Sequence, residues 1–116
     1  MAVPQDRGRA AEALAAAYLE LLGYHVVARN VRLGGVEVDL VADDGPVRVI
    51  VEVRLRSHRD FGGAAATVDR HKQERLVRAA HALLQRGSER VRIDVLAMDR
   101  DSEGLRLTHH RNAIDG

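Results

Sequence analysis

Two runs of alternating apolar and polar residues constrain the fold of this chain more than any other feature. They comprise residues 36–42 and 47–56, joined by the turn-forming residues 43–46. Alternation with a period of two is typical of a strand, whose successive side chains point to opposite faces. The pattern therefore predicts a β-hairpin with one valine-rich face and one polar face, the latter carrying Glu37, Asp39 and Glu52.

The carboxylates of the polar face predict a metal site. Burying the two valine-rich faces together leaves few pairing registers. One of them sets Glu37 opposite Glu52 and leaves Asp39 diagonally close to Glu52. Neighbours of this kind lie roughly 4.5 to 8 Å apart at Cβ. One divalent cation can bridge such a distance.

The rest of the chain reads as helices and strands around this hairpin. We expect helices over residues 6–22 and 68–85 and further strands over 24–32, 90–98 and 105–109, in the order α-β-β-β-α-β-β. The first helix is expected to bury Ala11, Leu14, Ala15, Tyr18, Leu21 and Leu22, and the second Leu76, Ala79, Ala80, Leu83 and Leu84. His109 and His110 are expected in a solvated terminus. The connection from 56 to 90 is long enough to place the fourth strand parallel to a neighbour. The sequence predicts an α/β fold, a mixed sheet flanked by helices, in a single domain spanning 1–116.

The composition of the chain limits the kinds of metal site and partner that we expect. The absence of cysteine excludes disulfides and thiolate zinc sites, so a metal would need oxygen ligands. We expect a soluble, cytoplasmic protein without a membrane partner, because no stretch reaches the length that crosses a bilayer. The net charge of +1 gives only weak support for a nucleic-acid partner. Lys72 is the only lysine among 18 basic residues. Arginine suits phosphate contacts, although a GC-rich genome also explains its abundance.

Asp39, followed by Glu52-Val53-Arg54 on the next strand, matches a short nuclease signature, an acidic residue and then Glu-x-Lys. The chain resembles the YraN family of small bacterial proteins, within the restriction-endonuclease-like PD-(D/E)xK superfamily. The resemblance rests on Gly8–Leu19, Gly23-Tyr24, Arg29-Asn30, Glu37-Val38-Asp39-Leu40, Val51-Glu52-Val53-Arg54, Phe61-Gly62, Val68, Lys72, Ala79-Ala80 and Asp94-Val95. It covers nearly the whole chain and implies a restriction-endonuclease-like fold.

The resemblance implies a site for Mg²⁺ or Mn²⁺. Asp39 and Glu52 are the primary ligands, with the Val53 carbonyl as a further ligand by family analogy and Glu37 or Glu12 completing the shell. Hard cations of this kind take oxygen ligands and retain several waters, so two or three carboxylates suffice against a phosphodiester. Without the resemblance, the same carboxylates would be a solvated face balanced by neighbouring arginines.

Arg54 stands where the superfamily has a lysine. Its guanidinium can stabilise phosphate charge but cannot accept a proton. Asp39, Glu52 and Arg54 are the catalytic candidates of a metal-dependent endonuclease, and the exchange leaves open a catalytically inert scaffold that binds nucleic acid or protein. Lys72, on the second helix, is an alternative source of the ammonium or an ordinary basic residue of the helix.

The basic residues predicted to contact nucleic acid are Arg56, Arg59, Arg70, Lys72 and Arg75. We expect DNA in preference to RNA, and branched or flapped DNA by analogy with junction resolvases. Only Tyr18, Tyr24 and Phe61 could stack on bases, so phosphate contacts would dominate. These residues are equally compatible with a charged helix face. A third interpretation is an interaction module whose hairpin edge pairs with another chain. The oligomeric state stays open.

Overall fold

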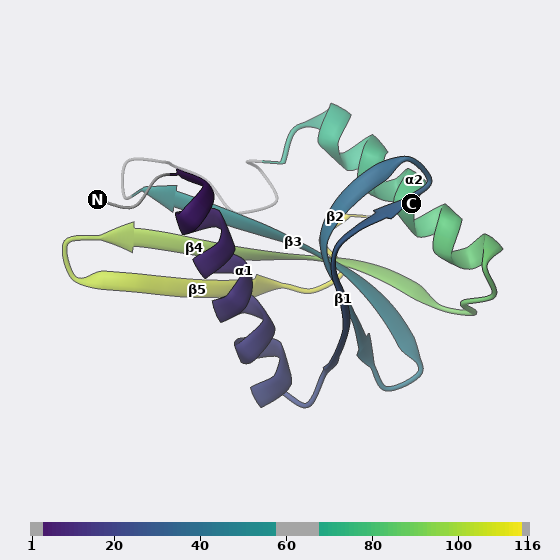
Figure 1. Ribbon diagram of the computed structural model, residues 1–116, viewed down its shortest axis with the longest axis horizontal. Helices are drawn as coiled ribbons and strands as arrows, with labels where there is room; N and C mark the ends of the chain where they lie inside the picture. The colour runs from purple at the N-terminus through teal and green to yellow at the C-terminus, as the bar shows by residue number, and fades with distance from the viewer. Residues whose placement is uncertain (1–3, 58–67, 115–116) are drawn as a thin grey trace.

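The computed structural model describes residues 4–57 and 68–114, which form one five-stranded sheet and two helices (Figure 1). The elements in chain order are α1 (Pro4–Leu21), β1 (His25–Leu33), β2 (Val36–Asp44), β3 (Val47–Ser57), α2 (Arg70–Gln85), β4 (Val91–Asp101) and β5 (Gly104–His110). The predicted order α-β-β-β-α-β-β is confirmed. The largest difference is at the end of β4, which continues to Asp101 instead of ending at Met98. None of the helices in the described part of the chain is long and apolar enough to cross a membrane.

The sheet is mixed, and its parallel pair lies at the centre of the topology. Strands lie side by side in the order β1-β2-β3-β4-β5. β1, β2 and β3 form an antiparallel meander, while β4 pairs with β3 in parallel and β5 returns antiparallel to β4. A parallel neighbour requires a crossover connection, here the segment that contains α2. The predicted α/β architecture is therefore confirmed.

Both faces of β3 are covered, so the hairpin is not polar on one side. Val49 and Val51 pack in a core cluster with residues of α1, and Ile50 packs in a second cluster with residues of α2. Because adjacent strand residues point to opposite faces, α1 and α2 lie on opposite faces of the sheet. Ile50 was the apolar exception on the expected polar face, and it is fully buried under α2. The face that carries Glu52 is thus covered by a helix.

The buried faces of the helices differ in part from prediction. α1 buries Ala11, Ala15, Ala16 and Leu19, whereas Leu14, Leu21 and Leu22 are exposed. On α2 the predicted set is buried apart from Leu84. The alanine-rich stretch allows several stripes of similar apolarity, and the smallest side chains let α1 approach the sheet most closely. The expected burial of Leu14, Leu21, Leu22 and Leu84 was wrong.

The turn between β1 and β2 packs directly on α2. Gly34 has a φ of +58°, and a Cβ at this position would lie 3.3 Å from both the Ala82 Cβ and the Arg78 carbonyl oxygen. A side chain would be strained by the backbone conformation and crowded by the helix. Glycine at this position therefore lets the β1–β2 hairpin seat against α2.

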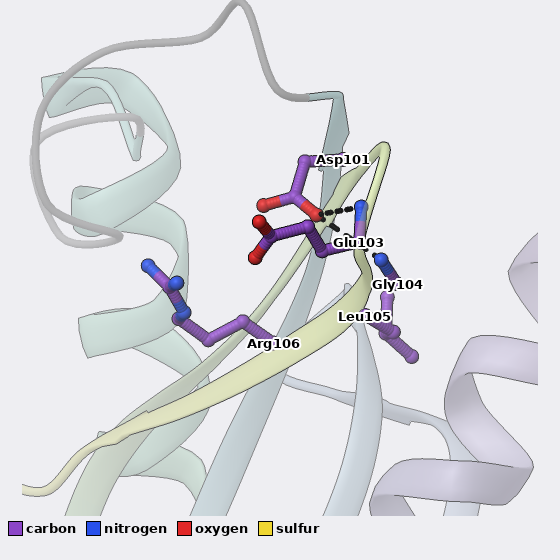
Figure 2. A pocket seen from close by; sticks show the side chains of 5 residues that line it. All are labelled: Asp101, Glu103, Gly104, Leu105 and Arg106. Atoms are coloured by element: carbon purple, nitrogen blue, oxygen red, sulfur yellow. Dashed lines mark hydrogen bonds between the residues drawn. The ribbon is translucent and has the colours of Figure 1, made fainter.

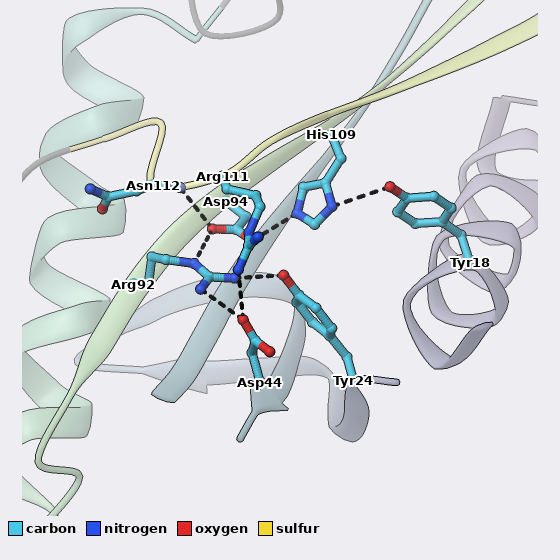
Figure 3. A network of polar contacts seen from close by, with 8 residues as sticks. All are labelled: Tyr18, Tyr24, Asp44, Arg92, Asp94, His109, Arg111 and Asn112. Atoms are coloured by element: carbon cyan, nitrogen blue, oxygen red, sulfur yellow. Dashed lines mark hydrogen bonds and ion pairs between the residues drawn. The ribbon is translucent and has the colours of Figure 1, made fainter. Parts of the chain in front are cut away.

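A buried carboxylate, Asp94 on β4, lies at the centre of a polar network (Figure 3). Its Oδ1 accepts hydrogen bonds from Arg92 Nε at 2.8 Å and from the Asn112 backbone N–H at 2.9 Å. Its Oδ2 accepts from Arg92 Nη2 at 2.9 Å and lies 2.7 Å from His109 Nε2. An ionised carboxylate only accepts, so His109 Nε2 carries a proton. His109 is largely buried, and the expectation of a solvated histidine at this position was wrong.

Arg92 extends the network from β4 to the meander. Its Nη1 contacts Asp44 Oδ2 at 2.9 Å, and its Nη2 donates to the Tyr24 hydroxyl at 2.7 Å. The Tyr18 hydroxyl of α1 lies 3.3 Å from His109 Nδ1. The network thus joins α1, β2, β4 and β5 through buried or half-buried polar groups.

The network stabilises the ionised form of Asp94. Burial by itself would raise the pKa, but the hydrogen bonds from His109 and Arg92 outweigh it and lower the pKa of Asp94 to about 2. The folded state therefore binds this proton less readily than the unfolded chain does. The resulting stabilisation is present above about pH 4 and is lost as the pH falls toward 2.

We predict that Asp94→Asn lowers the free energy of unfolding by roughly 2 to 4 kcal/mol at pH 7, because it removes the buried carboxylate that pairs with Arg92 and leaves Asp44 as the charged partner of that arginine. Urea unfolding followed by circular dichroism measures the change. The control is Asp43→Asn, which breaks the ion pair to Arg48 that is 2.6 Å long and more exposed, and should cost under about 1 kcal/mol. The wild type should lose its advantage over Asp94→Asn between pH 4 and pH 2, and equal stability of the two proteins at pH 7 would contradict this account.

Candidate functional site

The site forms where β2 and β3 stop pairing through their backbones. The last paired residues are Leu40 and Val51, and one further step in the same register places Asp39 opposite Glu52. The Val53 backbone N–H donates to Asp39 Oδ2 at 2.8 Å, so a side-chain carboxylate accepts the next hydrogen bond. The predicted pairing of Glu37 with Glu52 was wrong, since the Leu40–Val51 register sets Asp39 opposite Glu52. The structure brings Asp39 closer to Glu52 than the predicted register did.

Glu52 is a buried acid with an incompletely satisfied oxygen. It is 5% exposed. Among the buried side-chain atoms of the described residues, its Oε2 has no hydrogen-bond partner. The ammonium nitrogen of Lys72 lies 3.0 Å from this Oε2. That distance makes an ion pair without the directed geometry of a hydrogen bond, so the charge is partly balanced while the oxygen stays available to a further ligand.

The cap of α2 places Lys72 over Glu52. Asp69, the N-cap residue, accepts a hydrogen bond from the Lys72 backbone N–H at 2.8 Å. This contact sets Lys72 in the first turn of the helix. Leu76 and Ala79, further along α2, are buried against the sheet and fix the helix over the α2 face of β3. Lys72 therefore reaches the carboxylates from a rigid element.

Asp39 does not behave as an ordinary surface aspartate. Burial, followed by hydrogen bonding with the Glu52 carboxyl and repulsion from its charge, raises the pKa of Asp39 to about 7. The hydrogen bond from Val53 and the charge of Lys72 act in the opposite direction and are outweighed. Asp39 thus titrates near neutral pH, because its half-buried carboxyl lies beside a second carboxyl group.

The other two predicted carboxylate ligands are not assembled with this pair. Glu12 of α1 accepts a hydrogen bond from Asn30 Nδ2 at 3.0 Å, and Glu37 is exposed. Within residues 4–57 and 68–114, no group of three or more acidic or histidine side chains is placed to hold a metal. The carboxylates that the structure brings together are therefore two, Asp39 and Glu52. Val53 contributes its N–H to Asp39, and ligation by its carbonyl stays a prediction.

The predicted basic residues are distributed unevenly around the pair. Arg54 follows Glu52 by two residues, so it points to the same face of β3, where it is half-buried. Arg56 Nε donates to Asp99 Oδ1 at 2.8 Å, and the Arg56 side chain is only 9% exposed. Its guanidinium therefore takes part in a contact within the fold. Arg70 is exposed and Arg75 half-buried on α2. Arg59 lies outside the described residues.

A polar hollow at the β4–β5 turn, lined by Asp101, Glu103 and Arg106 among others, is separate from this site (Figure 2). Asp101 Oδ1 accepts hydrogen bonds from the backbone N–H groups of Glu103 at 2.9 Å and Gly104 at 3.1 Å. The carboxylate thus closes the turn. Its role is explained by local structure.

Lys72 is the site residue that sequence reasoning placed least well. Its contact with Glu52 joins residues 20 positions apart through a helix packed on a sheet, and no periodicity within either element encodes that contact. Its being the only lysine of the chain was the available signal.

We predict that Asp39→Asn stabilises the protein at pH 8 by roughly 2 kcal/mol, because the raised pKa of Asp39 means that the folded state pays for ionisation above pH 7. The asparagine oxygen can still accept from Val53, and its amide can donate to Glu52. The gain should shrink as the pH falls toward 5, where Asp39 already carries its proton. Urea unfolding at pH 5 and pH 8 measures it. A variant less stable than the wild type at pH 8 would contradict the prediction.

Comparison with known proteins places the chain in a family. The model of Uncharacterised protein family UPF0102 matches residues 11–98. A UPF0102 protein of Halorhodospira halophila is 52% identical over 96 residues, covering 83% of this chain and 79% of the relative. One from Janthinobacterium sp. is 46% identical over 113 residues, covering 96% and 89%. One from Dechloromonas aromatica is 48% identical over 110 residues, covering 94% and 90%. The chain therefore belongs to the UPF0102 family, the YraN family that its motifs resemble.

Proposed function

We propose that this protein is a metal-dependent phosphodiesterase that acts on DNA, with Asp39 and Glu52 holding Mg²⁺ or Mn²⁺. The observation that carries the proposal is the Asp39–Glu52 carboxylate pair, in which Glu52 is 5% exposed and its Oε2 lacks a hydrogen bond. A buried, unsatisfied carboxylate oxygen is costly unless a ligand uses it. Hard divalent cations prefer such oxygens.

The donor set fits a cation that keeps most of its waters. Asp39 Oδ2 is held by the Val53 N–H, which fixes the direction of the carboxylate. Glu52 Oε2 is presented from the neighbouring strand on the same face. Two protein carboxylates are sufficient for Mg²⁺, which retains water and takes further oxygens from a phosphate. A bound cation would supply charge neutralisation at the phosphate and a more acidic water.

The surrounding charge suits a polyanionic substrate. Arg54 follows Glu52 on the same face of β3, and Lys72 approaches from α2, where Arg75 follows it by three residues. Phosphate contacts of this kind position a backbone without reading its sequence. We therefore propose recognition by substrate structure, with branched or flapped DNA as the first class to assay.

An inert binding protein is the second candidate. Arg54 at the position of the superfamily lysine favours it, as does the presence of two assembled carboxylates where a fuller acidic shell was predicted. Under this alternative the carboxylate pair holds a cation, or none, and no phosphodiester is broken.

We predict that the wild type binds Mn²⁺ saturably and cleaves at least one of single-stranded, duplex or branched DNA. Asp39→Asn and Glu52→Gln should each weaken Mn²⁺ binding at least about tenfold and lower cleavage by about 100-fold or more. Calorimetric titration measures binding, and gel assays of labelled DNA measure cleavage. Because Asp39→Asn is expected to be the more stable protein, its loss of binding would not reflect unfolding.

The matched control is Glu20→Gln, which removes an exposed carboxylate from α1. It should leave binding and cleavage unchanged. Saturable Mn²⁺ binding without any cleavage would establish the inert alternative, and cleavage that survives Asp39→Asn would remove the pair from the chemistry.

A further inference from the structure

We infer that Lys72 is a displaceable cation of the site: its ammonium neutralises Glu52 while no metal is bound, and it would donate to the phosphate of the substrate when Glu52 holds a divalent cation. This inference rests on the proposed function and adds a catalytic residue from α2 to it.

The contact between Lys72 and Glu52 has the properties of a replaceable pair. The Nζ–Oε2 distance is 3.0 Å, yet Oε2 has no directed hydrogen bond. The Glu52 side chain is 6% exposed and that of Lys72 is 29% exposed. The acid is thus fixed inside the fold, while the lysine reaches it from the surface. Only the lysine has room to leave.

The chemistry of the lysine side chain suits this exchange. An ammonium is a point charge on a flexible stem of four carbons and donates in three directions, whereas a guanidinium is a planar fork. The chain uses lysine once among 18 basic residues, at this position. The backbone of Lys72 is held by the Asp69 cap. A side-chain movement would therefore leave α2 in place.

The arrangement makes the ammonium and a divalent cation competitors for one oxygen. A cation held by Glu52 Oε2 would be a second positive charge beside the ammonium, and like charges at contact distance repel strongly away from bulk water. Lys72 would turn away from Glu52 toward the surface, which its side chain, 29% exposed, already reaches. A phosphate bound to the same cation would lie there, and it would accept the ammonium as a hydrogen-bond donor.

The same residue is then expected to oppose metal binding and to promote cleavage. We predict that Lys72→Met binds Mn²⁺ about tenfold more tightly than the wild type, a change that corresponds to roughly one pK unit of electrostatic interaction. Its cleavage at saturating Mn²⁺ should fall by about 100-fold. Calorimetric titration and the DNA assay give the two values. Arg86→Met, which removes an exposed charge at the far end of α2, is the control and should change neither value.

The opposite signs separate this role from a structural one. Tighter Mn²⁺ binding together with weaker cleavage supports the inference. Weaker Mn²⁺ binding would show that Lys72 only supports the fold of the site, and unchanged cleavage would show that its ammonium does not reach the phosphate; either result overturns the inference. If the wild type cleaves nothing, the proposed function fails, and the effect of Lys72→Met on Mn²⁺ affinity still decides whether Lys72 and the metal compete.

A chemical restoration of the ammonium tests the residue without relying on loss of activity. The chain has no cysteine, so Lys72→Cys can be alkylated at that position alone. Treatment with bromoethylamine restores an ammonium on a stem of nearly the lysine length, whereas iodoacetamide adds a neutral group. We expect cleavage to return at least about tenfold above the untreated variant with the first reagent only. Equal activity after both reagents would overturn the role of the charge.

Discussion

The free-energy cost of burying an ionised side chain determines which partners the carboxylates inside this fold require. A buried carboxylate is tolerated when donors surround it, and otherwise it keeps a proton or recruits a cation. The protein contains both solutions. Asp94 has hydrogen bonds from Arg92 and Asn112 and a contact to His109, and its pKa falls to about 2. Asp39, beside Glu52, has one backbone donor, and its pKa rises to about 7.

The Asp94 network and the Asp39–Glu52 pair differ in how many elements their polar groups connect. The Asp94 network connects β4 to α1, β2 and β5 by hydrogen bonds, so its polar groups hold these elements together (Figure 3). The Asp39–Glu52 pair fastens little, and its Oε2 is left without a hydrogen bond. Incompletely satisfied groups with perturbed pKa values are concentrated at functional sites because a ligand can complete them. The same sheet thus carries a polar network that joins its elements and a carboxylate pair that a ligand could complete.

The topology explains why the pair lies on β3. This strand pairs with β2 on one side and with β4 on the other, and it is covered by a helix on each face. Glu52 and Val53 therefore sit on one of the most constrained segments of the fold. Asp39 joins them at the point where the β2–β3 ladder ends. A site built this way is held by backbone pairing, which favours the fixed ligand geometry that metal binding requires.

Much of this architecture followed from the sequence, and what did not follow has identifiable causes. The alternation of residues 36–56 located the hairpin and the two acids, and the long connection to β4 predicted the parallel pair. The pattern could not fix the register of β2 against β3, because a shift by two residues leaves every side chain on the same face. It was this degeneracy that set Glu37, in place of Asp39, opposite Glu52.

Contacts between different helices and strands could not be predicted from the periodicity within any one element. Alternation placed Ile50 on the face of Glu52, but that this face is covered by a helix depends on how α2 crosses the sheet. The contact of Lys72 with Glu52 and that of His109 with Asp94 arise in the same way. Each joins a basic side chain to an acid on another element, and each acid is buried by the packing itself. The burial that perturbs these groups is a property of the assembled sheet and helices, so the reactive behaviour of Asp39 exists only once α2 has packed on β3.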